Sequence, residues 1–549
     1  MTNPKLNINK YKYVIAIGVF AIYLCISFYK ISINSLWYDE GFSIDLANCS
    51  LEEITQYSLY YDTNPPLYLY ILHYWMQLFG ESELALRSLS ALAMSLGCGV
   101  FFLLCNKFFN WQTAIFSTLL FFVSNDLFYY AQEGRTYGLV ILFSILSTYS
   151  FLSLIKNPNW KNAILLGVFN SVVFYLHTLA SFVFVAQIFL IPILAFQKFC
   201  FYKKNGVNSI VLGYSLKHFL FYLLSWATFY FLFIPWQKRF IGILSAKGGS
   251  FWLTKPSVED LCKCLFDIFN GQTPFYIFLA ISILFILFMC FKKYLNNDFN
   301  YKLIITALVI GPCILFFSYY LAITVTPIFL KRYILFSTVG FILLLGYLLS
   351  ILSFQFLYKF ILFLCFSIFL LMNLKIPRES YWDYKEAMQL LKGKVNKETF
   401  FAIDEPLLFS YYGDIPDAFS SSWPVRDSIL RSNNVFPVKE PLWVNSTDFS
   451  KYNNIYFVTS YVQNYDQNGL ILETLNKKFK LDTLQSFKGV SIYHYKKFQI
   501  DTFQLNSIIQ NIKNDVPWYN EVKKIATKKN RTLDSILYEV ALWQIKKGK

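Results

Sequence analysis

Residues 36–66 read LWYDEGFSIDLANCSLEEITQYSLYYDTNPP and directly follow the first long apolar run of the chain. Asp39 and Glu40 therefore stand a few residues past the end of an expected membrane helix, at the boundary with water. Adjacent residues on an extended loop point apart, so we expect the two carboxylates to have different roles. One could act as a general base for a hydroxyl group. The structural alternative is a helix cap or a solvated pair.

The composition predicts a polytopic membrane protein. The chain has 549 residues, of which 56% are hydrophobic, and its mean hydropathy is +0.42. The net charge of +16 comes mostly from scattered lysines that flank apolar runs. Because no basic stripe interleaves with aromatic residues on a soluble domain, the charge predicts membrane lipids as partners and no nucleic acid.

Apolar runs long enough to cross a bilayer recur along the first two thirds of the chain. Length and hydropathy predict about eleven spans. They lie near residues 14–32, 84–105, 113–130, 138–155, 162–176, 179–197, 218–236, 273–291, 303–324, 333–353 and 357–374. Leu67 to Phe79 is too short to span and is expected to lie along the interface.

The charges between these runs predict an orientation. Alternate short connections carry Lys107, Lys156, Lys161, Lys198, Lys203, Lys204, Lys217, Lys292, Lys293, Lys302 and Lys359. The positive-inside rule puts these connections and the N-terminus in the cytoplasm. Of the fourteen Asp and Glu in residues 1–375, only Asp298 falls on that side. We expect a multi-pass protein of the inner (cytoplasmic) membrane, with its C-terminal part outside the cytoplasm.

The sequence divides into three regions. Residues 1–375 form a transmembrane domain, with outer loops at 34–83 and 237–272. Residues 376–500 have ordinary polarity and predict a small α/β domain, with strands at 399–404, 454–459 and 490–495 and helices at 386–391 and 470–479. Residues 501–549 form a helical tail, in which two amphipathic helices divide near residues 529–531.

Further polar residues fall on the predicted outer side. Glu133 and Arg135 lie in one short turn and either pair with each other or contact a ligand, since arginine suits a phosphate. Lys331 and Arg332 also fall on this outer side, where the positive-inside rule makes cations scarce. They therefore need a carboxylate or an anionic ligand as partner. His177, between the fifth and sixth spans, is more simply a structural hydrogen-bonding residue. Asn64 precedes two prolines that suffice as a helix start.

Several motifs, taken together, resemble the GT-C superfamily of polyprenyl-phosphate-sugar glycosyltransferases. The nearest branch is the bacterial relatives of the dolichyl-phosphate-mannose protein mannosyltransferases (glycosyltransferase family 39-like) and of the lipid A aminoarabinose transferase. The motifs are Trp37-Tyr38-Asp39-Glu40, Asn64-Pro65-Pro66-Leu67-Tyr68, Leu86-Arg87-Ser88-Leu89-Ser90-Ala91, Tyr130-Ala131-Gln132-Glu133-Gly134-Arg135-Thr136-Tyr137, Pro235-Trp236 and Phe329-Leu330-Lys331-Arg332-Tyr333.

The resemblance implies an inverting membrane glycosyltransferase, moving a hexose or pentose from a polyprenyl-phosphate donor to a glycan, lipid or protein acceptor at the outer face. It implies Asp39 as the general base, with Glu40 and Glu133 as further catalytic candidates. Arg135, Lys331 and Arg332 are the candidates for the donor phosphate, and Asn64 and His177 are secondary candidates.

The sequence departs from the family where some relatives hold a metal. Asn64 and residues 237–239 (Gln-Lys-Arg) replace the expected Glu or His ligands. We therefore predict no metal site, and leave a divalent metal open as a cofactor. Two functional alternatives also stay open. One is a transporter or flippase for a lipid-linked glycan, which predicts ionisable groups near the bilayer midplane. The other is a non-catalytic protein of envelope assembly.

Overall fold

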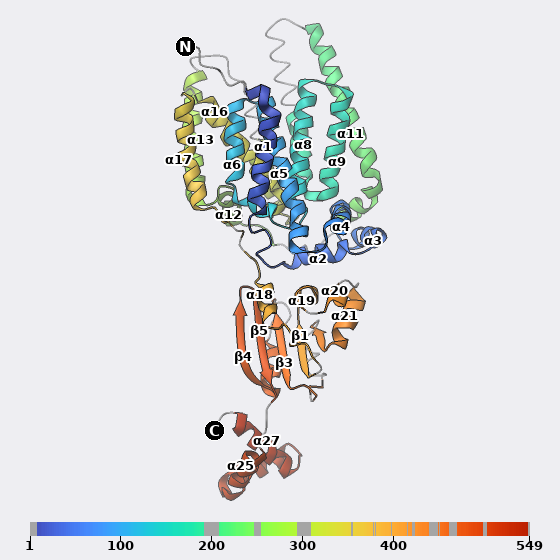
Figure 1. Ribbon diagram of the computed structural model, residues 1–549, viewed down its shortest axis with the longest axis vertical. Coiled ribbons are helices and arrows are strands. Elements are labelled where there is room, and N and C mark those ends of the chain that lie inside the picture. The colour runs from blue at the N-terminus through green and yellow to red at the C-terminus, as the bar shows by residue number, and fades with distance from the viewer. Residues whose placement is uncertain are drawn as a thin grey trace. The chain divides into compact units, whose positions relative to one another are not determined.

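The computed structural model divides into two compact units (Figure 1). It describes residues 8–191, 208–245, 254–293, 309–352, 355–376, 378, 380–396, 398–413, 415–419, 423–438, 448–449, 451–460, 469–497 and 502–546. The first unit comprises residues 1–34 and 39–379, and the second comprises residues 35–38 and 380–549. Asp298, Lys198, Lys203, Lys204, Lys302 and part of the predicted outer loop 237–272 lie outside the described residues.

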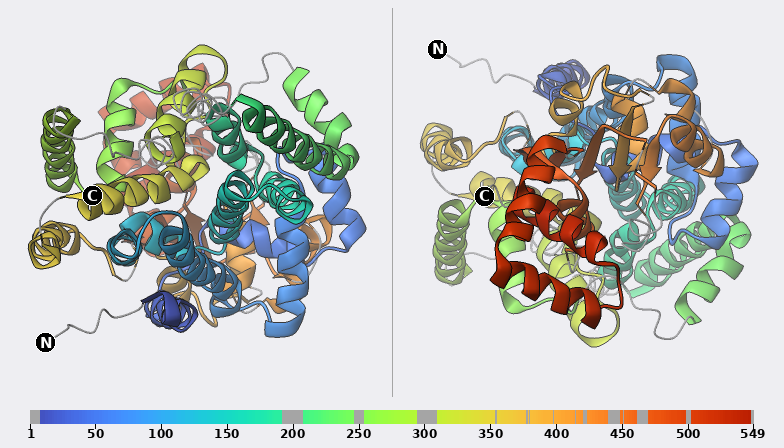
Figure 2. Two further views of the ribbon diagram at one scale, coloured as in Figure 1. Left: turned by 90° about the horizontal axis from the view of Figure 1, so that it is seen from above. Right: turned by 90° about the horizontal axis from the view of Figure 1, so that it is seen from below.

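The first unit is helical. Its helices are α1 (Ile8–Phe28), α2 (Tyr38–Ala47), α3 (Leu51–Tyr60), α4 (Leu67–Phe79), α5 (Glu83–Phe108), α6 (Trp111–Phe122), α7 (Asn125–Ala131), α8 (Tyr137–Lys156), α9 (Trp160–Leu176), η1 (Thr178–Ser181), α11 (Asn208–Ser245), α12 (Val258–Ile268), α13 (Gln272–Lys293), η2 (Val309–Cys313), α15 (Ile314–Thr324), η3 (Lys331–Ile334), α16 (Phe336–Ile351) and α17 (Phe356–Met372). Figure 2 shows many of them end-on.

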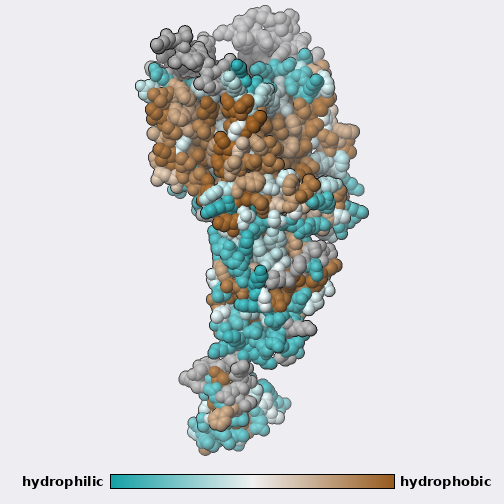
Figure 3. Space-filling model, viewed as in Figure 1, coloured by the Kyte–Doolittle hydropathy of each residue, from teal (hydrophilic) through white to brown (hydrophobic). Residues whose placement is uncertain are grey.

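The long apolar helices confirm a polytopic helical membrane protein. Among the described residues, four helices are long and apolar enough to cross a membrane, and two bent helix pairs bring this number to six if each pair is one span. Five further apolar helices are shorter. The predicted number of about eleven spans therefore remains a prediction. Apolar side chains cover the flank of this unit in Figure 3, as lipid contact requires.

Short helices occupy one end of the first unit. Figure 1 shows α2, α3, α4 and α12 at the end of the bundle opposite the N-terminus of α1. Ser50 and Glu53 form the predicted capping box at the start of α3. The predicted interfacial stretch forms α4 over the same residues, Leu67–Phe79. This end of the bundle holds most of the candidate site residues.

Glycine allows α5 and α8 to pack closely. A Cβ added at Gly138 would lie 2.6 Å from the backbone oxygen of Ser90. Real Cβ atoms do not approach backbone that closely, so the two helices would have to separate. This contact fixes the start of α8, and therefore the turn before it that carries Glu133 and Arg135.

The second unit contains a five-stranded sheet and confirms the small C-terminal α/β domain. The strand order is β2-β1-β3-β5-β4, with β1 parallel to β2 and β3 and the other pairs antiparallel. Its elements are α18 (Tyr384–Gln389), β1 (Thr399–Ile403), α19 (Pro406–Tyr412), α20 (Pro416–Phe419), α21 (Trp423–Ser432), β2 (Val435–Pro437), β3 (Asn454–Thr459), α24 (Leu470–Lys478), β4 (Lys480–Phe487) and β5 (Val490–Lys496). Every residue of the interior strand β1 is buried, as in strands covered on both faces.

The sequence predicted three of these five strands. β2 has only three residues, and β4 is exposed along almost its whole length, so neither shows a buried alternation. The tail differs more. It contains three helices, α25 (Thr502–Asn514), α26 (Val516–Lys528) and α27 (Leu533–Lys546), instead of the predicted two. The predicted break near residues 529–531 is present. The missed break falls at Asp515, whose side chain caps α26 just before Pro517.

Candidate active site

The two carboxylates of the first loop lie in the first turn of α2, so the expected extended loop at this point is wrong. Acidic residues are favourable there because the helix dipole is positive at its N-terminus. Consecutive residues of a helix point about 100° apart. The predicted divergence therefore holds for a different reason: the side chain of Asp39 is 23% exposed, and that of Glu40 is fully buried.

Glu40 binds two arginines. Arg87 donates from Nε to Oε1 at 2.9 Å and from Nη2 to Oε2 at 2.8 Å, and Arg378 Nη2 lies 3.2 and 3.1 Å from the two oxygens. The backbone N–H of Gly134 donates to Oε1 at 2.8 Å. Burial favours a raised pKa for Glu40, but Arg378, Arg87 and the Gly134 N–H outweigh it and lower that pKa to about 2. The carboxylate is thus charged and saturated with donors, which is the environment of a structural group.

Arg87 also holds the end of the first helix. Its Nη1 donates to the carbonyl oxygens of Ile31 at 2.9 Å and Asn34 at 2.8 Å. One guanidinium therefore connects α5, the chain after α1 and the start of α2. Neither Arg87 nor Arg378 was among the predicted site residues. The sequence contains a signal for Arg87, since an arginine one turn inside an apolar span needs a buried carboxylate partner.

Asp39 meets a cation from a distant part of the chain. Arg332 Nη1 lies 3.3 Å from Asp39 Oδ2. The Arg332 guanidinium also lies 5.5 Å from the ring centre of Tyr333. The predicted need of Arg332 for a partner is therefore met by a carboxylate. Both side chains are about one fifth exposed, so the pair can be reached from outside the protein.

Arg135, in the turn before α8, contacts the first turns of α2. Its Nη1 donates to the backbone oxygen of Asp39 at 3.0 Å and to Ser43 Oγ at 2.6 Å. Its buried Nε has no hydrogen-bond partner among the described residues. Arg135 and Arg332 thus hold Asp39 from two sides, one through the backbone and one through the carboxylate.

Glu133 is buried beside this cluster. It is 1% exposed, and within the described ranges its Oε2 has no hydrogen-bond partner and no ion pair joins it to Arg135. Burial raises the pKa of Glu133 to about 7, with Arg378 opposing and Glu40 adding to the rise. Its protonation therefore changes near neutral pH.

The two secondary candidates, Asn64 and His177, lie close together in space. Asn64 Oδ1 accepts a hydrogen bond from the backbone N–H of Thr178 at 3.3 Å, directly after His177. The His177 ring lies 4.9 Å from that of Tyr333 and 6.0 Å from that of Tyr137. Burial, with Arg135 and Arg332 nearby, lowers the pKa of His177 to about 3, so the ring is neutral.

Lys331 points away from Arg332. Its Nζ lies 2.8 Å from Asp126 Oδ1 and 3.1 Å from Asp267 Oδ2. Burial opposes the charge of Lys331, but the two carboxylates outweigh it and raise its pKa. The adjacent cations therefore contact different carboxylates, and Asp126 and Asp267 are site residues that sequence reasoning did not single out.

The residues at the family's metal position do not fit a metal centre. The Asn64 oxygen is used by Thr178, and Arg239 donates to the backbone oxygen of Asp62 at 2.8 Å. Among the described residues, no three His, Cys, Asp or Glu side chains lie close enough together to hold a metal ion.

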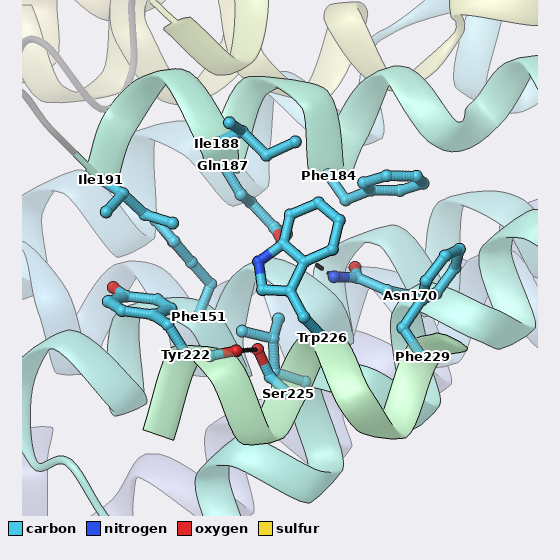
Figure 4. A pocket seen from close by; sticks show the side chains of 11 residues that line it. Phe151, Asn170, Phe184, Gln187, Ile188, Ile191, Tyr222, Ser225, Trp226 and Phe229 are labelled. Carbon is cyan, nitrogen blue, oxygen red and sulfur yellow. Dashed lines mark hydrogen bonds between the residues drawn. The ribbon is translucent and has the colours of Figure 1, made fainter. Parts of the chain in front are cut away.

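A small cavity lies away from this cluster, among α8, α9, the helix Thr178–Ile191 and α11 (Figure 4). Its volume of about 20 Å³ suffices for about one water molecule. The polar groups at its wall are already engaged: Asn170 donates to Gln187 Oε1 at 3.1 Å and accepts from Ser147 at 2.6 Å. The cavity is thus a packing feature among aromatic side chains.

The fold and this cluster define a helical membrane protein with a group of charged residues at one end of the bundle. Residues 63–226 match the family model described as dolichyl-phosphate-mannose-protein mannosyltransferase. This match spans less than a third of the chain and supports the resemblance to the GT-C glycosyltransferases; it covers Arg87, Glu133, Arg135 and His177. No curated protein matches the chain.

The chain also resembles solved structures. ArnT from Cupriavidus metallidurans in the apo state has 13% identity and a TM-score of 0.49, with 88% of this chain and 97% of that chain covered. The same protein bound to undecaprenyl phosphate gives 13% identity and a TM-score of 0.48, with the same coverage. The Archaeoglobus fulgidus oligosaccharyltransferase, in its complex with zinc and sulfate, has 10% identity and a TM-score of 0.43, with 87% of this chain and 73% of that chain covered.

Proposed function

We propose that the chain is an inverting glycosyltransferase that moves a sugar from a polyprenyl-phosphate donor to an acceptor hydroxyl or amine. The observation that carries the proposal is the convergence of Asp39, Arg135 and Arg332, from three distant parts of the chain, on one partly exposed point. The family match over residues 63–226 supports a donor of this kind, since its description names a polyprenyl-phosphate sugar.

In the proposed reaction Asp39 is the general base. The acceptor oxygen or nitrogen attacks the anomeric carbon while the bond from that carbon to the phosphate oxygen breaks. The acceptor's proton passes to Asp39, and the electron pair of the broken bond leaves on the polyprenyl phosphate. A base and a charge stabiliser for the leaving group are what this displacement needs.

Arg332 and Arg135 are proposed to stabilise the phosphate. Negative charge on the phosphate rises as the glycosidic bond breaks, so cations aimed at it favour the transition state. Arg332 would share its guanidinium between the phosphate and Asp39, which frees the carboxylate to take the proton. The neutral His177 ring lies beside Tyr333 and adds no competing cation.

Glu40 and Lys331 receive other roles in this proposal. Glu40 fixes the start of α2 through Arg87 and Arg378, and thereby positions Asp39. Lys331 is committed to Asp126 and Asp267 and does not contact the donor. Glu133 is proposed as a buried neighbour that tunes the charge around Arg135 and Arg332.

We further propose that this end of the bundle faces outside the cytoplasm, with residues 376–549 on the same side and the N-terminus inside. The charge separation supports this orientation. Lys107, at the far end of α5, donates to Tyr149 and Ser153 near the end of α8. Glu40, Glu133 and Asp126 gather at the opposite ends of these helices.

Complementation tests the function. A strain lacking the gene is compared with its parent by mass spectrometry of envelope glycans. The wild-type gene should restore the missing modification, and Asp39→Asn should not. Glu52→Gln, an exposed carboxylate of α3 in the same loop, serves as the matched control and should restore it. Full restoration by Asp39→Asn would refute the proposed base.

A further inference from the structure

A large cavity whose lining residues are mostly polar lies beside the candidate active site and has no role in the mechanism above. Its volume is about 560 Å³, within the range of about 300–1,000 Å³ typical of ligand sites. The residues that line it include Asn125, Asp126, Asp267, Lys331, Lys375 and Arg378. Asp39, Arg135 and Arg332 do not line it, so it is distinct from the proposed donor-phosphate site.

Two broken helices meet at this cavity. The chain bends by 62° between α6 and α7 and by 85° between α12 and α13. The residues at or next to these breaks, Asn125, Asn270 and Gly271, line the cavity, together with the end of α17 at Met372. Irregular backbone in a membrane protein is tolerated where it is buried in protein or lines a water-filled cavity. The two breaks are therefore placed where the cavity can satisfy their irregular backbone.

Side-chain amides hold the wall in place. Asn125 donates to the backbone oxygen of Asn373 at 2.6 Å and accepts from the backbone N–H of Lys375 at 2.8 Å. Asn270 donates to the backbone oxygens of Val123 at 2.7 Å and Leu370 at 3.1 Å. These bonds join the two breaks to the end of α17, so the cavity is preorganised before any ligand binds.

Arg378 supplies unused N–H donors at the wall, beside one carboxylate oxygen, Asp126 Oδ2, that also has no hydrogen-bond partner among the described residues. Asp126 and Asp267 are both bound to Lys331. Arg378 shares Glu40 with Arg87, so one carboxylate faces two guanidiniums. Arg378 is 4% exposed, and its Nε and Nη1 have no hydrogen-bond partner among the described residues. A buried guanidinium with unused donors favours a carboxylate or phosphate ligand.

We infer that this cavity is the acceptor subsite and that its ligand is a glycan unit bearing a carboxylate or phosphate group, which Arg378 binds. The inference rests on the proposed function. The cavity wall is joined to the proposed base in two ways: Arg378 binds Glu40, which follows Asp39 in the chain, and Lys331 precedes Arg332, which binds Asp39. Its mixed carboxylate, amine and amide wall suits sugar hydroxyls, and its volume suits one or two sugar rings.

Direct binding to the full-length protein tests the inference without relying on turnover. Glucuronic acid, glucose and inorganic phosphate are titrated in turn by saturation-transfer NMR. Glucuronic acid should bind at least about 10-fold more tightly than glucose, the scale of one charge-assisted hydrogen-bonded contact. Arg378→Lys keeps a cation for Glu40 but loses the unused N–H groups, and should weaken glucuronic acid at least about threefold.

Two further variants keep the test interpretable. Lys375→Gln changes an exposed side chain at the cavity and should also weaken binding even if Arg378→Lys fails to fold. Lys263→Gln, an exposed lysine of α12 paired with Glu259, should bind like wild type. Equal binding of glucose and glucuronic acid, or equal binding by phosphate alone, would overturn the inference. So would wild-type affinity in both cavity variants.

The same experiment separates this inference from the proposed function. Asp39→Asn leaves the cavity wall intact and should bind glucuronic acid like wild type. If the wild-type protein binds glucuronic acid but transfers no sugar, the proposed function is contradicted and the anion-binding cavity is not. If the wild-type protein transfers sugar but does not bind glucuronic acid, only the inferred acceptor subsite is contradicted.

Discussion

Glu40→Gln should destabilise the protein. Among the described residues, Glu40 is the one carboxylate that pairs with the two buried guanidiniums of Arg87 and Arg378, and the substitution removes its charge. The substitution keeps the shape of the side chain, so its effect is electrostatic. Arg87 cannot turn away to water because it is also held by the backbone oxygens of Ile31 and Asn34. Breaking a buried ion pair by removing one partner costs about 3–5 kcal/mol.

The lowered pKa of Glu40 points to a stabilisation of the same order. Its lowering from 4.5 to about 2 corresponds to about 3 kcal/mol, at about 1.4 kcal/mol per pH unit. This stabilisation is present above pH 4.5 and is lost as the pH falls toward 2, since protonation of Glu40 then favours the unfolded chain. The two values agree at the lower end of the range.

The assay is thermal unfolding of the purified protein in detergent at pH 7. Glu40→Gln should melt several degrees below wild type, and Glu52→Gln, which removes an exposed carboxylate of the same loop, should melt within about 1 °C of wild type. If both variants melt with wild type, the Glu40 network does not hold this end of the bundle together.

Three further predictions concern the neighbouring residues. Glu133→Gln should melt close to wild type at pH 5 and clearly above it at pH 8. The cost of charging buried Glu133 rises between the usual pKa of 4.5 and its raised pKa of about 7, and it levels off above that at about 3 kcal/mol. A melting difference that does not depend on pH would contradict the assigned burial effect. Gly138→Ala should lose about 1–3 kcal/mol in a melting assay because its Cβ meets Ser90, whereas Gly18→Ala meets nothing and should be neutral; equal stability of both would disprove the tight packing of α5 on α8. Arg332→Lys should lower sugar transfer at least about 10-fold despite its charge, as the planar fork is lost, with Lys263→Gln as control; wild-type transfer by Arg332→Lys would exclude a bidentate phosphate contact.

The sequence predicted the fold class because long apolar runs joined by lysine-rich connections are typical of helical membrane proteins and of few other folds. It also placed the three interior strands β1, β3 and β5 and the capping box at Ser50, where local patterns decide the structure. It missed β4 because that strand is exposed, and α2 because its mixed sequence shows no clear apolar face.

The site was predictable only in part. Asp39, Arg135 and Arg332 stood out as charges at the ends of apolar runs, and the structure brings them together. The separate roles of neighbours were not visible, since the partners of Asp39 and Glu40, and of Lys331 and Arg332, depend on the direction of each side chain in the fold. Arg378 and Asp267 gave no sequence signal, because their partners lie far away in the chain and only the fold brings them into contact.

The proposed mechanism requires Asp39 to take the acceptor's proton while Arg135 and Arg332 bind the donor phosphate. It is tested most directly by comparing purified Asp39→Asn with wild type in donor binding and in sugar transfer. Asp39→Asn should bind the polyprenyl-phosphate sugar within about twofold of wild type and transfer it at least about 100-fold more slowly, the scale of a lost general base. Transfer by Asp39→Asn at the wild-type rate would contradict the account.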